Sequence, residues 1–228
     1  MSLFIIEGID GSGKSTQISL LSEHLFADGY PVKTVKFPNY EDRSSAPVRM
    51  YLEGELGTDP GAVNAYAVSS FYAVDRFISF KKFWEKDYAE GKIILSDRYT
   101  MSNLIHQGSK LPENQRAAYL EWLYDFEFEK MQIPRPDMIF YLDVNPEYSV
   151  KQVEKRYGGD EGKKDIHEKD LSYLRTCYTA GIAACEQTGA VVVECVRNGK
   201  MLPAEEIHAF IYRRIKEKIL SGNGSTVD

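Results

Sequence analysis

Apolar residues along the chain gather first in short runs that glycine, proline or charged residues interrupt. These runs are rich in β-branched and aromatic side chains, which is typical of buried strands. The second run follows a turn signal, the segment DGYP at residues 28–31. The pattern predicts five strands, at residues 3–7, 31–37, 92–97, 137–144 and 190–195.

Between the strands, apolar residues recur at the spacing of amphipathic helices, as Ile18, Leu21 and Leu25 do. This spacing predicts helices at residues 14–26, 62–88, 113–131, 146–156, 169–188 and 203–220. Strands that alternate with helices predict an α/β architecture of three layers, a parallel five-stranded sheet with helices on both faces. We expect a single domain over residues 1–220 and a disordered polar tail at residues 221–228.

Composition and charge restrict the class of protein. The 228 residues are 43% hydrophobic and 27% charged, a mixture typical of soluble globular domains. No apolar run approaches the roughly 20 residues that a membrane span needs, so we expect no membrane partner. No basic segment precedes the first apolar residues, which indicates a cytoplasmic protein. The formal charge of −6 argues against a general nucleic-acid binder, so we expect no nucleic-acid partner.

The stretch from Gly8 to Ser15, GIDGSGKS, fits the phosphate-binding pattern GxxxxGK[ST] between a predicted strand and a predicted helix. Glycines let backbone N–H groups surround phosphate oxygens, and the helix directs its positive end at the same anion. Lys14 is placed to reach the β- and γ-phosphates, and Ser15 to bind Mg²⁺. The motif predicts a P-loop nucleotide-binding protein, whether kinase, GTPase or motor. The residues expected to bind the phosphates are Gly8, Gly11, Ser12, Gly13, Lys14, Ser15 and Thr16.

Three further clusters bear on the group that receives the phosphate. The first, KFPNY at residues 36–40, follows the second predicted strand, with Arg43 just beyond. In the second, Tyr72 and Arg76 share one helix face, where a ring and a guanidinium suit a flat base. The alternative to base recognition is that Tyr72 is only a core aromatic and Arg76 only a surface arginine. The helix pattern alone favours this alternative. The third cluster ends the third strand, where ligands of open parallel sheets bind. There Asp97 is placed to hold Mg²⁺ and Arg98 a phosphate, unless the two form only a salt bridge.

Taken in order, these segments resemble the thymidylate kinases, P-loop enzymes that phosphorylate dTMP to dTDP with ATP in the synthesis of dTTP. The matching segments are IEGIDGSGKST, KFPNY, FYAVDR, DRYTMSNLIHQG, PDMIFYLDVNPE and the C-terminal strand and helix. Each segment alone is a weak signal, whereas the ordered set, which spans residues 3–215, is specific. The resemblance implies a P-loop NTPase fold with a short lid at residues 155–166, ATP and Mg²⁺ as cofactors, and a homodimer.

The resemblance also implies roles for residues at matching positions. Lys14, Asp97, Arg98 and Arg156 would act in catalysis, with Ser15 and Asp97 on the metal. Arg197 and Asn198 lie where the family places its adenine pocket. The residues implied to bind the acceptor nucleotide are Asp10, Phe37, Pro38, Arg43, Tyr72, Arg76, Arg98, Ser102, Asn103 and His106.

Within that set, each group has an implied contact. Asp10 would meet the 3′-hydroxyl of the deoxyribose, and Phe37 and Pro38 would line the nucleotide cleft. Tyr72 would stack on thymine while Arg76, Ser102 and Asn103 reach the base. Arg98 would hold the monophosphate.

The chain departs from the family pattern at three positions. The arginine that commonly follows the FP motif is here Tyr40, for which Arg43 is a candidate replacement. His106 stands where the family usually has tyrosine, near the sugar 2′ position, which puts strict selection of deoxyribose in question. Some family members carry a P-loop arginine where this chain has Gly11. We therefore expect a residue of the segment 155–166 to supply the cation that stabilises the transition state. Arg156 is the first candidate, and Lys163 and Lys164 are the next ones. The alternative is that this segment is only a solvated surface loop.

Two other classes of function stay open. One is a kinase for another nucleoside monophosphate or for a deoxynucleoside, although a deoxynucleoside kinase needs a base to deprotonate a hydroxyl. The phosphate of dTMP is already an anionic nucleophile, so no catalytic base is assigned. The other is a nucleotide-binding switch protein, but the chain lacks the N/TKxD guanine motif of GTPases.

Overall fold

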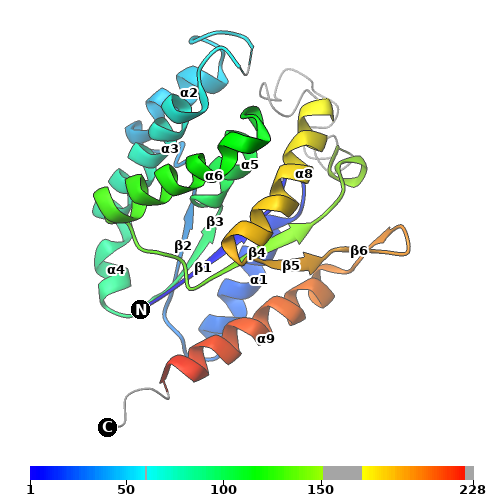
Figure 1. Ribbon diagram of the computed structural model, residues 1–228. Helices are drawn as coiled ribbons and strands as arrows, with labels where there is room; N and C mark the ends of the chain where they lie inside the picture. Colours follow the sequence, from blue (N-terminus) through cyan, green and yellow to red (C-terminus); the bar gives the residue numbers. More distant parts are fainter. Residues whose placement is uncertain (60, 151–170, 224–228) are drawn as a thin grey trace.

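The computed structural model, which describes residues 1–59, 61–150 and 171–223, is built on a parallel five-stranded sheet in the order β2-β3-β1-β4-β5 (Figure 1). The strands are β1 (Ser2–Glu7), β2 (Val32–Lys36), β3 (Ile93–Asp97), β4 (Met138–Asp143) and β5 (Val191–Glu194). All five predicted strands are confirmed, with each end within one residue of its expected position. The predicted P-loop α/β architecture is therefore confirmed.

Side chains of the central strands alternate between two hydrophobic layers, because successive residues of a strand point to opposite faces. Phe4 and Ile6 of β1 pack on the face that α1 (Lys14–Ala27) and α9 (Ala204–Asn223) cover. Leu3 and Ile5 pack on the other face. That face is covered by α3 (Ala65–Ser79), α5 (Met101–His106), α6 (Glu113–Tyr124) and α8 (Leu171–Thr188) (Figure 1).

The helices match the predicted ones less closely than the strands do. The long helix expected at residues 62–88 is interrupted, because α3 passes into a wider π-type turn (Phe80–Trp84) and then into α4 (Glu85–Ala89). The helix expected at 113–131 likewise ends in a π-type turn (Asp125–Lys130). Two short helices, α2 (Ala46–Leu52) and α5, were not predicted. Residues 146–150 are helical as expected, and the rest of that predicted helix lies outside the described residues.

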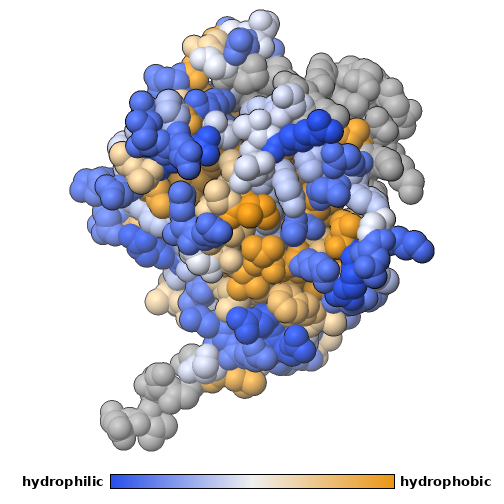
Figure 2. All heavy atoms as spheres, turned by 45° about the vertical axis from the view of Figure 1, so that its right-hand side comes forward, coloured by the Kyte–Doolittle hydropathy of each residue, from blue (hydrophilic) through white to orange (hydrophobic). Residues whose placement is uncertain are grey.

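The edge strand β5 and a small hairpin of β6 (Val196–Arg197) and β7 (Lys200–Met201) form one side of the molecule. Figure 2 shows apolar surface gathered on this side, where Val192 of β5 is 44% exposed. α9 continues to Asn223, past the expected start of the tail, and residues 224–228 lie outside the described residues. Within the described ranges, none of the helices combines the length and apolar character that a membrane crossing requires.

Candidate active site

The glycine loop between β1 and α1 adopts a backbone that side chains with a Cβ rarely tolerate. Gly8 has φ +146°, and a Cβ added there would lie 2.6 Å from Ser12 Oγ. Gly13, which precedes the first residue of α1, has φ +94° in the left-handed region. These positions require glycine, so the loop turns sharply and directs its backbone into the N-terminus of α1.

Lys14 lies across this loop. Its Nζ donates to the carbonyl oxygens of Gly8 at 3.0 Å and Ile9 at 2.9 Å, and it lies 3.9 Å from Asp10 Oδ1. Burial, together with the charge of Arg98, lowers the pKa of Lys14 to about 8. The ammonium is therefore still charged at neutral pH and poorly hydrated, a state in which a phosphate oxygen is a strong alternative partner.

Ser15 and Asp97 join the start of α1 to the end of β3. Ser15 Oγ donates to Asp97 Oδ2 at 2.9 Å, while the buried Asp97 Oδ1 has no hydrogen-bond partner among the described residues. A hydroxyl and a carboxylate are hard oxygen ligands of the kind that Mg²⁺ prefers. In the described part of the chain, no three His, Cys, Asp or Glu side chains converge on a metal site. These two residues therefore fit Mg²⁺ that is bound jointly with phosphate oxygens and water.

Arg98, directly after β3, has a left-handed backbone with φ +70°. Its Nη2 donates to Asp10 Oδ1 at 2.5 Å, and its Nη1 lies 3.2 Å from both Ser102 Oγ and His106 Nε2. Although burial opposes the charge on Asp10, Arg98 and Lys14 hold the pKa of that carboxyl well below its usual range. The alternative of a salt bridge between Asp97 and Arg98 is thus wrong for the described residues, because Arg98 pairs with Asp10 of the P-loop instead.

Glu7, the last residue of β1, is a site residue that the sequence analysis missed. It is fully buried and accepts hydrogen bonds from the Tyr99 N–H at 2.8 Å and from Ser102 Oγ at 2.9 Å. Burial raises the pKa of Glu7, and the nearby Arg98 counteracts this increase. Glu7 therefore anchors the backbone directly after Arg98 and the side chain of Ser102. The sequence held one signal for this role, because Glu7 is the single carboxylate at the end of an otherwise apolar strand.

A hollow of about 110 Å³ opens where these groups meet. Its lining comes from the P-loop, the start of α1 and the ends of β2 and β3, namely Asp10, Gly11, Gly13, Lys14, Ser15, Thr16, Lys36, Asp97 and Arg98. Lys36, at the end of β2, was quoted in the KFPNY segment but not assigned to the site. The hollow brings three cations, Lys14, Lys36 and Arg98, beside the glycine loop, which suits the binding of phosphate groups.

Arg76 of α3 is held in a buried ion pair. Its Nε and Nη2 donate to the two carboxylate oxygens of Glu127 at 2.6 and 2.5 Å, and the side chains are 1% and 0% exposed. Asn103 of α5 lies beside the pair, with its Nδ2 3.5 Å from Glu127 Oε1. Tyr72, one turn before Arg76, packs against the cluster around Val48. The alternative of a surface arginine is thus wrong, and Glu127 is a second residue that the sequence analysis missed.

The KFPNY segment is fixed to α3 by Asp75. This buried carboxylate accepts from the Asn39 N–H at 2.8 Å and from Ser44 Oγ at 2.6 Å. Phe37 is buried against the ring of Tyr99, with centroids 5.8 Å apart, and the Phe37–Pro38 peptide is cis. Asp75 and Tyr99 therefore hold the segment that follows β2 beside the hollow.

The backbone of Tyr40 binds an arginine of α2. Arg49 of α2 donates from Nη1 to the Tyr40 carbonyl oxygen at 2.9 Å and to Ser45 Oγ at 2.8 Å. Arg43 is exposed and does not line the hollow. Its role as a replacement stays a prediction.

Other predicted residues lie apart from the hollow. Arg197 and Asn198 are exposed in the β6–β7 hairpin, where Arg197 forms ion pairs with Glu194 and Glu206. Their assignment to an adenine pocket stays a prediction. The proposed lid cations Arg156, Lys163 and Lys164 lie outside the described residues.

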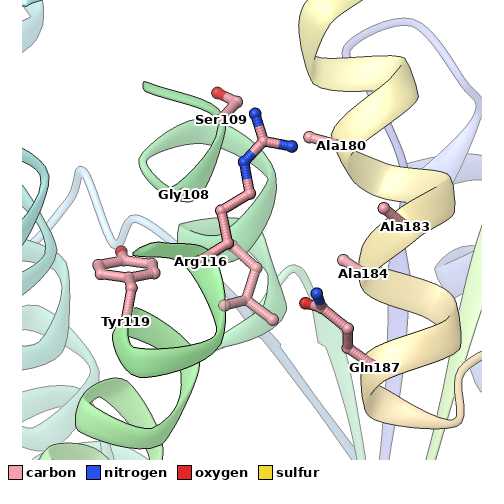
Figure 3. Close-up of a pocket in the computed structure, with 9 residues that line it drawn as sticks. Gly108, Ser109, Arg116, Tyr119, Ala180, Ala183, Ala184 and Gln187 are labelled. Carbon is pink, nitrogen blue, oxygen red and sulfur yellow. The ribbon is translucent and has the colours of Figure 1, made fainter. Parts of the chain in front are cut away.

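A second, much smaller hollow of about 20 Å³ lies between α8 and the segment from α5 to α6 (Figure 3). The small side chains of Ala180, Ala183 and Ala184 line it from α8, and Arg116 and Tyr119 line it from α6. Its volume holds about one water molecule. The hollow is therefore a packing feature, and the small residues let α8 lie close to α5, which carries Asn103 and His106.

Comparison with known proteins gives a consistent result. The family model described as thymidylate kinase matches residues 6–207. A probable thymidylate kinase from Pyrobaculum aerophilum is 28% identical over 219 residues, 96% of this chain and 98% of that relative. The thymidylate kinase of Mycobacterium tuberculosis is 30% identical over 200 residues, 86% of each chain. A probable thymidylate kinase from Thermococcus onnurineus is 34% identical over 154 residues, 67% of this chain and 71% of that relative.

Proposed function

Because this chain belongs to the thymidylate kinase family and is a nucleoside monophosphate kinase, we propose that it transfers the γ-phosphoryl group of Mg·ATP to dTMP, in the cytoplasmic synthesis of dTTP. The observation that carries the proposal is the hollow that the P-loop shares with Arg98. A donor phosphate on the loop and an acceptor phosphate on Arg98 would then lie next to each other. Phosphoryl transfer depends mainly on such positioning and on charge neutralisation.

On the donor side, the backbone of the glycine loop and Lys14 would bind the β- and γ-phosphates. Ser15 and Asp97 would hold Mg²⁺, which when bound would supply positive charge that neutralises the phosphate groups. The unpartnered Asp97 Oδ1 supports this role. Lys14 would exchange its two backbone carbonyl partners for phosphate oxygens as ATP enters.

On the acceptor side, Arg98 would exchange Asp10 for the phosphate of dTMP, since both are anions that a guanidinium binds through paired N–H groups. Asp10 would then be released to accept from the sugar 3′-hydroxyl. Tyr72 would stack on thymine, and Arg76, fixed by Glu127, would recognise the base. The acceptor oxygen is anionic at neutral pH, so the reaction needs no general base.

Initial rates of ADP release with Mg·ATP and single acceptors test this function. The panel is dTMP, dUMP, UMP, CMP, AMP, GMP and thymidine, and we expect dTMP to give the highest kcat/KM. Equal rates with UMP would refute the acceptor assignment and leave the family chemistry in place. Preference for thymidine would instead indicate a deoxynucleoside kinase.

We further propose that the homodimer, which the family resemblance implies, forms through residues 66–84. Tyr66, Val74 and Phe83 in this segment are each 38–42% exposed, so a second copy of the chain would cover their apolar side chains. Sedimentation velocity should give twice the mass of the 26.0 kDa chain. Val74→Glu should shift the protein toward the monomer, and an unchanged dimer would place the contact elsewhere.

A further inference from the structure

His106, the last residue of α5, lies between Arg98 and α8. Its Nε2 is 3.2 Å from Arg98 Nη1. Its Nδ1 is 3.3 Å from Tyr173 Oη and 3.5 Å from Cys177 Sγ, both on α8. The imidazole therefore connects the arginine of the phosphate site to α8, which packs on the sheet face opposite to that of α1.

The partners of His106 determine where its proton lies. A guanidinium can only donate, so His106 Nε2 must accept and carries no proton in this contact. A neutral imidazole then has its proton on Nδ1, facing Tyr173. The Tyr173 hydroxyl donates to the His106 backbone carbonyl at 3.2 Å, so its oxygen can accept from Nδ1. Tyr173 thus satisfies both the ring and the backbone of His106.

We propose that His106 is a positioning residue for Arg98, in which a neutral imidazole, kept in its Nδ1-protonated form by Tyr173, orients the guanidinium toward the acceptor phosphate. Protonation of His106 replaces this hydrogen bond with repulsion between two cations and weakens acceptor binding. The inference rests on the proposed function, because it assumes that Arg98 holds the acceptor phosphate.

Other titratable groups lie near Arg98 and His106, Glu7 among them, so a pH series reports on the imidazole through the contrast with His106→Gln. Burial raises the pKa of the Cys177 thiol to about 12 and that of Tyr173 well above its usual value, so both stay neutral. Asp10 stays ionised because Arg98 holds it. Lys110, close to Cys177, has a pKa that burial lowers to about 8, so a pH series should end at 7.5.

A pH series of KM for dTMP tests the proposal. His106→Gln keeps an acceptor oxygen that does not titrate, His106→Leu removes the acceptor, and His24→Gln is the control, since His24 lies on α1 beside α9. At pH 7.5, Leu should raise KM for dTMP about fivefold, the worth of one ordinary hydrogen bond, and leave KM for ATP unchanged. His106→Gln should keep a KM for dTMP within about twofold of the wild-type value, because its amide oxygen can still accept from Arg98.

As the pH falls to 5.5, KM of the wild type and of His24→Gln should rise relative to His106→Gln. The phosphate of dTMP also titrates near pH 6, but this effect cancels in the ratio because all variants bind the same acceptor. A ratio that stays constant across the series would overturn the proposal. If His106→Leu had the same KM for dTMP as the wild type at pH 7.5, this result would also overturn the proposal.

A second readout does not depend on catalysis. Imidazole ¹⁵N–¹H correlation spectra, with the His106 signals identified by their absence in His106→Gln, should show a proton on Nδ1 at pH 7.5. Tyr173→Phe should shift the population toward Nε2–H. A wild-type ring protonated on Nε2 would overturn the inference whatever the acceptor is. An Nδ1–H ring in a protein that prefers UMP would instead refute only the proposed substrate.

Discussion

The buried pair of Arg76 and Glu127 gives the sharpest test of how the fold and acceptor recognition depend on each other. We predict that Glu127→Gln strongly destabilises the protein. Two charge-assisted hydrogen bonds of 2.5 and 2.6 Å join side chains that are at most 1% exposed. In the variant, an amide N–H₂ faces a guanidinium that can only donate, and a buried charge loses its counterion. Removal of one partner from such a pair costs about 3–5 kcal/mol of unfolding free energy.

Urea unfolding followed by circular dichroism measures this cost, with Glu129→Gln as the matched control. Glu129 pairs with Arg135 in the same segment, but those side chains are 58% and 55% exposed, so its loss should change stability by less than about 1 kcal/mol. The double variant Arg76→Met/Glu127→Leu should lose less unfolding free energy than Glu127→Gln alone, because it leaves no uncompensated buried charge. Equal stability of wild type and Glu127→Gln would refute the buried pair.

The double variant also separates folding from acceptor recognition. It lacks the guanidinium that we propose to contact the base, so KM for dTMP should rise while KM for ATP stays at the wild-type value. A folded double variant with unchanged KM for dTMP would mean that Arg76 serves the fold alone. Equal loss of dTMP and ATP binding would contradict the assignment of Arg76 to the acceptor.

Three further predictions follow from the site and from one partly buried histidine pair. Lys36→Met should lower kcat more than about tenfold if this cation meets the charge that develops on the transferred group, and an unchanged kcat would exclude that role. Asp97→Asn should raise the Mg²⁺ concentration for half-maximal rate by about 10–100-fold, and an unchanged Mg²⁺ titration would contradict the metal role. His24 Nδ1 and His208 Nε2 lie 2.5 Å apart, and burial and His24 lower the pKa of His208. The unfolded chain therefore binds more protons below about pH 6.5, so the urea midpoint should fall with pH there, and less so in His208→Gln.

The strands and the glycine loop could be predicted because their signals are local. Each strand is a short apolar run, and the loop from Gly8 to Ser15 fits its motif in full. The order β2-β3-β1-β4-β5 then places Asp97 and Arg98 beside that loop, because the carboxyl ends of parallel strands meet at one edge of the sheet.

The features that the sequence did not predict depend on tertiary contacts or on an extra residue in a helical turn. Helical periodicity does not show the wider turn at Phe80–Trp84, because the apolar spacing continues through it. α5 is short, and its residues were interpreted as binding groups rather than as a helix. Glu127 and Tyr173 gain their importance only from Arg76 and His106, partners that lie 51 and 67 residues away in the chain.

The central claim is that the site transfers a phosphoryl group from ATP bound at the P-loop to dTMP. A competition experiment tests this claim most directly. Mg·ATP is supplied with equimolar dTMP, dUMP and UMP, and the diphosphates are quantified by mass spectrometry at low conversion, so that their ratio equals the ratio of kcat/KM values. The account predicts that dTDP predominates and that Lys14→Met forms almost no diphosphate. UDP formed as fast as dTDP, or undiminished product with Lys14→Met, would contradict it.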